Sequence, residues 1–113
     1  MSTLSTHVLD TMHGTPASGM TVVLSGPDGE IARSHTNSDG RCPDLVSGPL
    51  PSGHYSLAFA VAAYFRAHKV ELPDPPFLDV VTIDFGIATD GKDGHYHVPL
   101  LVSPWSYSTY RGS

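Results

Sequence analysis

The sequence predicts an all-β sandwich of seven or eight short antiparallel strands with one short helix. Eleven glycines and ten prolines are spread over the 113 residues, and they separate short runs of strand-forming residues. Regularly spaced turn residues between short runs are typical of sandwiches and barrels. The composition, 40% hydrophobic and 15% charged, is that of a globular protein. A chain of this length holds one core, so we expect a single domain over residues 1–113.

Seven runs of strand-forming residues follow one another between these turns. Pro27-Asp28-Gly29, for example, predicts a tight turn, because proline fixes φ and glycine accepts positive φ. The clearest alternation of apolar and polar side chains lies in residues 81–87, which predicts one face in the core and one wetter face. The expected strands are residues 4–10, 19–24, 31–36, 54–60, 81–87, 96–102 and 106–110.

Residues 61–69 break the strand pattern. Their alanines, Ala62, Ala63 and Ala67, favour a short helix of about two turns. The segment Leu-Pro-Asp-Pro-Pro at residues 72–76 should then be extended, because each proline restricts the residue before it.

Charge and composition argue against several classes of protein. The net charge of −5 disfavours nucleic acid or an anionic membrane surface as a partner. A lone Cys42 excludes an internal disulfide framework and a cysteine-rich zinc site. The first twenty residues carry no signal-peptide pattern, and the longest nearly apolar stretch, residues 57–65, is too short to span a bilayer. We therefore expect a cytoplasmic protein.

Common hydrolase and nucleotide-binding motifs are missing, so the candidate chemistry lies with the seven histidines. His95 and His97 are two residues apart in an expected strand, so both point to one face. Such a pair, with His7, could also hold zinc. Four other histidines are interpreted as ordinary surface or hydrogen-bonded residues: His13, His35, His54 and His68. Arg41 follows a turn, where an arginine is usually only solvated, and Cys42 is interpreted as an inert small side chain.

Three stretches carry a more specific pattern. They are STHVLD at residues 5–10, TNSDGR at residues 36–41, and an ending that reads YHVPLL at residues 96–101 and SPWSYSTYRGS at residues 103–113. Together they resemble the transthyretin-like proteins that are 5-hydroxyisourate hydrolases. The resemblance covers essentially the whole chain, and the terminal YRGS is its most specific part.

The resemblance implies a transthyretin-like (prealbumin-like) sandwich that assembles as a homotetramer, a dimer of dimers, with active sites at the interface between dimers. It implies hydrolysis of 5-hydroxyisourate, the product of urate oxidation, to 2-oxo-4-hydroxy-4-carboxy-5-ureidoimidazoline, with no metal and no cofactor. The catalytic residues of the family correspond to His7, Arg41, His97 and Ser113. Tyr110 and Arg111 correspond to substrate-binding residues. Thyroid-hormone-binding proteins share the fold but lack the histidine of Tyr96-His97 and the YRGS ending.

These residue types suit the opening of a cyclic amide. Histidine titrates near neutral pH, so His7 could activate water as a base and His97 could orient groups or donate a proton. The reverse assignment stays open. Arg41 offers a planar fork of donors to the carbonyls of the substrate and to developing negative charge. Ser113 combines a hydroxyl with the terminal carboxylate.

Two alternatives belong to other functional classes. A non-catalytic transthyretin-like binding module would fit the first half of the chain equally well, and only Tyr96-His97 and YRGS argue against it. A zinc-dependent cyclic amidohydrolase would use His7, His95 and His97, and sensitivity to a chelator would identify it.

Overall fold

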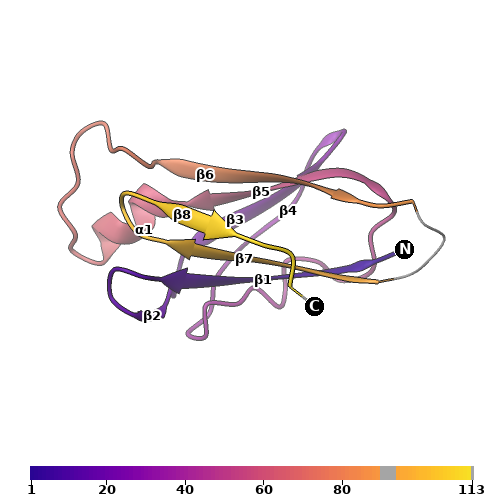
Figure 1. The fold of residues 1–113 in the computed structure, drawn as a ribbon, viewed down its shortest axis with the longest axis horizontal. Helices are drawn as coiled ribbons and strands as arrows, with labels where there is room; N and C mark the ends of the chain where they lie inside the picture. The colour runs from indigo at the N-terminus through magenta and orange to yellow at the C-terminus, as the bar shows by residue number, and fades with distance from the viewer. Residues whose placement is uncertain (90–93, 113) are drawn as a thin grey trace.

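The strands form two layers packed face to face (Figure 1), in a computed structural model that describes residues 1–89 and 94–112. The first sheet has the order β2-β1-β7-β8, in which the strands are β1 (Thr3–Asp10), β2 (Thr15–Pro16), β7 (His95–Val102) and β8 (Tyr107–Thr109). The second has the order β4-β3-β5-β6, in which they are β3 (Thr21–Gly26), β4 (Gly29–His35), β5 (Gly53–Ala60) and β6 (Val80–Ile87). Helix α1 (Val61–Ala67) connects β5 to β6.

The predicted all-β sandwich with one short helix is confirmed, with two differences in detail. Strand β2 is not among the expected strands, because a strand of two residues is too short to show alternation. The expectation that all strands are antiparallel is wrong for β1 and β7, which pair in parallel. No hairpin turn connects these two strands, since the whole second sheet lies between them in the sequence, so no local signal fixed their direction.

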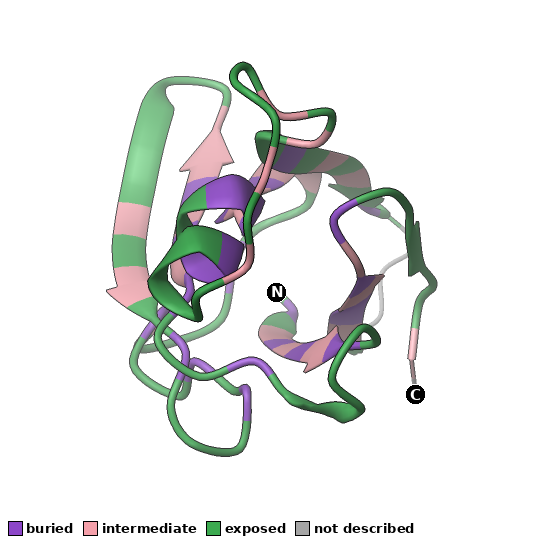
Figure 2. Ribbon diagram, turned by 90° about the vertical axis from the view of Figure 1, so that its left-hand side faces the viewer, coloured by how far each residue is buried: buried purple, intermediate pink, exposed green. Residues whose placement is uncertain are grey.

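The core lies between the two sheets and under one side of α1. Along β3, Val22 and Leu24 are fully buried, while Thr21 and Val23 are only partly covered. Figure 2 shows buried positions on the strands and on the inner side of the helix, whereas the loops are mostly exposed. The predicted alternation of β6 is also confirmed, because Val81 and Ile87 are buried. Removal of this apolar surface from water is the main force that holds the layers together.

The proline-rich segment differs from its prediction. The chain bends at Asp74 and Pro75, where the peptide bond is cis, instead of remaining extended. The rule used in the prediction restricts the backbone of the residue before a proline, but it does not say which isomer of the peptide bond forms.

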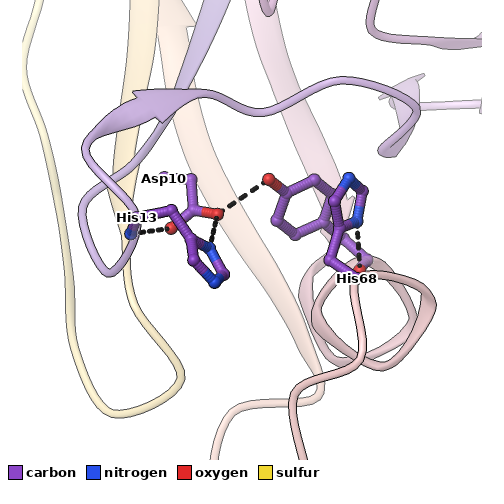
Figure 3. Close-up of polar contacts among 4 residues, drawn as sticks. Asp10, His13 and His68 are labelled. Atoms are coloured by element: carbon purple, nitrogen blue, oxygen red, sulfur yellow. Dashed lines mark hydrogen bonds and ion pairs between the residues drawn. The ribbon is translucent and has the colours of Figure 1, made fainter.

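A buried carboxylate joins the first sheet to the helix (Figure 3). Asp10 is almost fully buried at the end of β1, and its Oδ2 accepts a hydrogen bond from the Tyr64 hydroxyl at 2.8 Å. The same oxygen lies 2.6 Å from Nδ1 of His13, while Oδ1 accepts a bond from the His13 backbone N–H at 2.9 Å. Burial acts to raise the pKa of Asp10, but these hydrogen bonds outweigh it and lower the pKa below its usual value.

Replacing Tyr64 by phenylalanine should lower the free energy of unfolding by about 1–3 kcal/mol, because the buried carboxylate of Asp10 loses a donor. Urea denaturation measures this difference. The matched control is Tyr107→Phe, since the Tyr107 side chain is exposed on β8. Equal stability of the two variants would show that the hydroxyl of Tyr64 contributes nothing to the attachment of the helix.

Candidate active site

Four polar side chains share the outer face of the first sheet. Strand alternation turns Ser5 and His7 of β1 away from the core, and it does the same for His95 and His97 of β7. The parallel register places Ser5 beside His97. His97 is half-buried, so this face is partly shielded from water.

Arg41 joins this face through the loop that follows β4. A β-bridge pairs Arg41 with His7, and paired residues on neighbouring strands point to the same side. Gly40 lies directly against β1, where its carbonyl accepts a hydrogen bond from the Val8 N–H at 2.8 Å. Its φ of +76° suits glycine, and a Cβ there would lie 2.4 Å from the carbonyl oxygen of Val8.

Asn37 holds the loop that presents Arg41. Its Oδ1 accepts hydrogen bonds from the backbone N–H groups of Asp39 at 2.9 Å and Arg41 at 3.0 Å. The Asn37 N–H donates in turn to the carbonyl of Arg41 at 2.8 Å. Asparagine side chains favour turns because they make such local bonds to the backbone.

Replacing Asn37 by alanine should lower kcat/KM about tenfold, the effect expected when about 1.4 kcal/mol of positioning is lost. The rate is measured with 5-hydroxyisourate, the substrate that the family resemblance implies. Asn37→Asp is the matched control, because its carboxylate keeps an acceptor for both N–H groups. If Asn37→Ala retains wild-type kcat/KM, the loop positions Arg41 without this side chain.

The end of the chain returns to His97. A β-bridge pairs Gly112 with His97, and the Gly112 N–H donates to the His97 carbonyl at 2.7 Å. In Figure 1 the segment after β8 runs past β7 towards the C-terminus. A Cβ on Gly112 would lie 2.7 Å from Cδ2 of His97, so only glycine fits against the ring without a shift. The predicted catalytic residue Ser113 lies outside the described residues.

The surroundings of His97 favour the neutral imidazole. Burial lowers the pKa of His97, and repulsion from Arg41, and from His7 and His95 when they are protonated, lowers it further. The same interactions show that Arg41 and His7 lie close enough to His97 to affect its charge. From one side to the other, the sheet thus carries Arg41, His7, His97 and Gly112.

Tyr110 and Arg111 lie at a neighbouring cavity. The Arg111 guanidinium stacks 3.9 Å above the centre of the Tyr96 ring, and it donates to the carbonyl of His95 at 3.3 Å. Both residues line a cavity of about 250 Å³ that β6 and Tyr96 also border. Tyr96 points to the opposite face of β7 from His97. The structure therefore groups His7, Arg41 and His97, whereas Tyr110 and Arg111 line a cavity on the other face of β7.

The chain is similar to known proteins over nearly its whole length. The model of the HIUase/Transthyretin family matches residues 4–112. The chain belongs to this family. A family member from Ralstonia nicotianae, a 5-hydroxyisourate hydrolase, is 55% identical over 119 residues, which cover 100% of both chains. The predicted membership is confirmed.

Solved structures of HIUase/transthyretin family members show the same fold. The 5-hydroxyisourate hydrolase of Klebsiella pneumoniae superposes with a TM-score of 0.86 at 43% identity, and the match covers 100% of each chain. Sea bream transthyretin in complex with thyroxine gives a TM-score of 0.82 at 30% identity, over 96% of this chain and 93% of that one. The predicted transthyretin-like sandwich is thereby confirmed.

The described residues offer no preformed set of ligands for the zinc-dependent alternative. Within residues 1–89 and 94–112, no three His, Cys, Asp or Glu side chains are arranged to hold a metal ion. His95 and His97 instead both contact the hydroxyl of Ser5.

Cys42 is buried, and burial together with the charge of Asp44 raises its pKa to about 11, as suits an inert thiol. In the same residues, no helix is long and apolar enough to cross a membrane.

Three residues that contact the predicted catalytic residues were not predicted from the sequence to have a role in the site. Ser5, Asn37 and Gly112 touch or position the predicted residues, although none of them carries a charge. Ser5 stands two residues before His7 on an expected strand, and this spacing was the available signal. The signals for the other two depend on contacts between distant segments.

Proposed function

We propose that this protein hydrolyses 5-hydroxyisourate to 2-oxo-4-hydroxy-4-carboxy-5-ureidoimidazoline in urate breakdown. One observation carries the proposal: His7, Arg41 and His97 lie together on the outer face of β1 and β7, and Gly112 lies against His97. Relatives that match over their full length are 5-hydroxyisourate hydrolases, which supports the same substrate here.

The proposed mechanism divides the work among these side chains. A water molecule loses a proton to an imidazole of the pair His7 and His97 as it attacks a ring carbonyl. His97 then gives a proton to the ring nitrogen that leaves. A positioned acid or base typically contributes about 10²–10⁴-fold to the rate. Arg41 donates hydrogen bonds to the carbonyl oxygen, where negative charge develops in the transition state.

The remaining predicted residues belong to substrate binding and positioning in this proposal. Ser113 follows Gly112, which lies against His97, and is proposed to take part in catalysis as the family resemblance implies. Tyr110 and Arg111 are proposed to bind the substrate where their segment crosses β7 to reach His97 at Gly112. The stacking of Arg111 on Tyr96 helps to fix the path of the segment that leads to Gly112.

A homotetramer, arranged as a dimer of dimers, is the proposed assembly. Strands β6 and β8 end their sheets and border one cavity, so their unpaired edges lie on the same side of the sandwich. Beside these edges Phe77 and Trp105 are 70% and 58% exposed, with ring centroids 6.1 Å apart. Exposed aromatic side chains at a strand edge favour association. Sedimentation velocity should give about four times the chain mass of 12.0 kDa, whereas a monomer would contradict the assembly.

The experiment that tests the activity generates 5-hydroxyisourate in the cuvette with urate oxidase and follows its ultraviolet decay. Decay should accelerate when the protein is added, with or without a chelator. Decay at the spontaneous rate under all conditions would contradict the proposed function and favour a binding module. Acceleration that a chelator abolishes and added zinc restores would favour the zinc-dependent enzyme.

A further inference from the structure

We propose that Thr3, His95 and Ser5 form a proton relay that switches His97 between its two neutral tautomers. The proposal rests on the proposed hydrolase function, which it deepens. It assigns a role to three side chains that need not contact the substrate. They are positioning residues, because they act through His97.

The relay is a continuous chain of short polar contacts along β1 and β7. Nδ1 of His97 lies 2.7 Å from the hydroxyl oxygen of Ser5. The same oxygen lies 2.8 Å from Nε2 of His95, and Nδ1 of His95 lies 2.6 Å from Oγ1 of Thr3. Both nitrogens of His95 are thus engaged, and Thr3 is exposed to water at the outer end of the chain.

The parallel register of the two strands creates this geometry. Thr3 stands beside His95 and Ser5 beside His97, so two hydroxyls and two imidazoles alternate on one face. Nε2 of His97 makes no hydrogen bond to any of the residues 1–89 and 94–112. It is therefore free to face a substrate, while Nδ1 faces the relay.

Hydrogen-bond chemistry allows two arrangements of the same heavy atoms. A serine hydroxyl has one proton, so Ser5 donates to one of its two histidines and accepts from the other. When Ser5 donates to His97, the proton of His97 sits on Nε2, and the ring is a proton donor towards the site. When Ser5 donates to His95, His97 carries its proton on Nδ1, and its Nε2 lone pair is a base.

The protons balance over one turnover. His97 Nε2 takes a proton from the attacking water, and Nδ1 passes its proton to Ser5. Ser5 passes its own proton to Nε2 of His95, and Nδ1 of His95 releases one through Thr3 to solvent. His97 Nε2 then donates to the leaving ring nitrogen, and the chain shifts back as solvent returns one proton through Thr3. No proton is gained or lost, and His97 stays neutral.

Two further observations support this inference. Burial and the charge of Arg41 lower the pKa of His97, which disfavours an imidazolium and makes a neutral route useful. Ser5 and His97 are half-buried, so water does not freely replace the contact between them. In this scheme a single ring can serve as base and then as acid, and His7 helps to hold the attacking water.

The first test reads the tautomer directly and does not need catalysis. Nitrogen-15 NMR of the imidazoles, assigned with His97→Asn, should show intermediate shifts at both nitrogens of His97 in the wild-type protein. Ser5→Ala should give one protonated and one unprotonated nitrogen. Ser5→Thr keeps the hydroxyl and should restore the intermediate shifts. A single fixed tautomer in the wild-type protein would overturn the relay.

The second test is kinetic and separates a relay from simple hydrogen bonding. In mixtures of H₂O and D₂O, kcat of the wild-type protein should depend on the deuterium fraction along a curve, because several protons move. Ser5→Ala should make the plot linear. It should also lower kcat roughly tenfold with little change in KM, and this loss is smaller than the full contribution of an acid or base. His95→Gln should do the same, because glutamine keeps a hydrogen bond to Ser5 but cannot exchange one proton for another between two nitrogens.

The outcomes distinguish failure of the relay from failure of the proposed function. An inactive wild-type protein with intermediate nitrogen shifts would contradict the hydrolase and leave the tautomer exchange supported. An active wild-type protein would overturn the relay if His95→Gln or Ser5→Ala kept wild-type kcat and a curved isotope plot.

Discussion

Replacing His97 by asparagine should lower kcat/KM for 5-hydroxyisourate by about 10²–10⁴-fold, the usual contribution of a positioned acid or base. The amide of asparagine can take the place of Nδ1 and keep a hydrogen bond to Ser5, so the sheet should stay intact. What is lost is Nε2, the nitrogen that faces the proposed substrate site. The ultraviolet decay assay measures the rate, and circular dichroism checks the fold.

His35→Asn is the matched control, because His35 is an exposed strand histidine on the other sheet. It should retain wild-type kcat/KM. If His97→Asn also retained it, His97 would be excluded as acid or base.

The pH profile gives a second reading of the same residue. Burial lowers the pKa of His97, and the charges of Arg41, His7 and His95 lower it further. A lowered pKa means that the ring stays neutral to more acidic pH. If the neutral ring is required, kcat/KM should fall only below the ordinary histidine pKa of about 6.5. If kcat/KM already fell at a pH well above 6.5, the loss would be assigned to the titration of another group.

Replacing Gly112 by alanine should lower kcat/KM about 10²-fold, as expected when catalytic groups are displaced by about an ångström. The new Cβ would lie 2.7 Å from Cδ2 and 3.1 Å from Cβ of His97. The ring cannot turn away freely, because its Nδ1 is held by Ser5 at 2.7 Å. Either the imidazole of His97 moves, or the segment around residue 112 moves away from the ring. Both changes disturb the site.

The free energy of unfolding should change little in this variant, within about 0.5 kcal/mol, because Gly112 packs only against the sheet surface. Gly48→Ala is the control, since a Cβ at Gly48 meets nothing within 4 Å. Kinetic assays and urea denaturation of both variants separate activity from stability. Wild-type kcat/KM in Gly112→Ala would show that close packing against His97 is unnecessary.

Local patterns were sufficient to predict most of the secondary structure. The alternation in β6 and the alanines of α1 produced the right elements, because burial on one face and helix propensity act over a few residues. The same patterns failed for β2 and for the bend at Asp74 and Pro75. A two-residue strand and the isomer of one peptide bond depend on the surrounding chain.

The sequence by itself determined the sandwich, the short helix and the family, since strand alternation, turn residues and the YRGS ending are local features of the chain. It also singled out His7, Arg41 and His97 through the resemblance. Only the tertiary structure decided that β1 and β7 run parallel, and this register brings Ser5 between His95 and His97. The physical reason is sequence distance: residues about ninety positions apart meet only when both sheets have formed, and no local pattern records that contact.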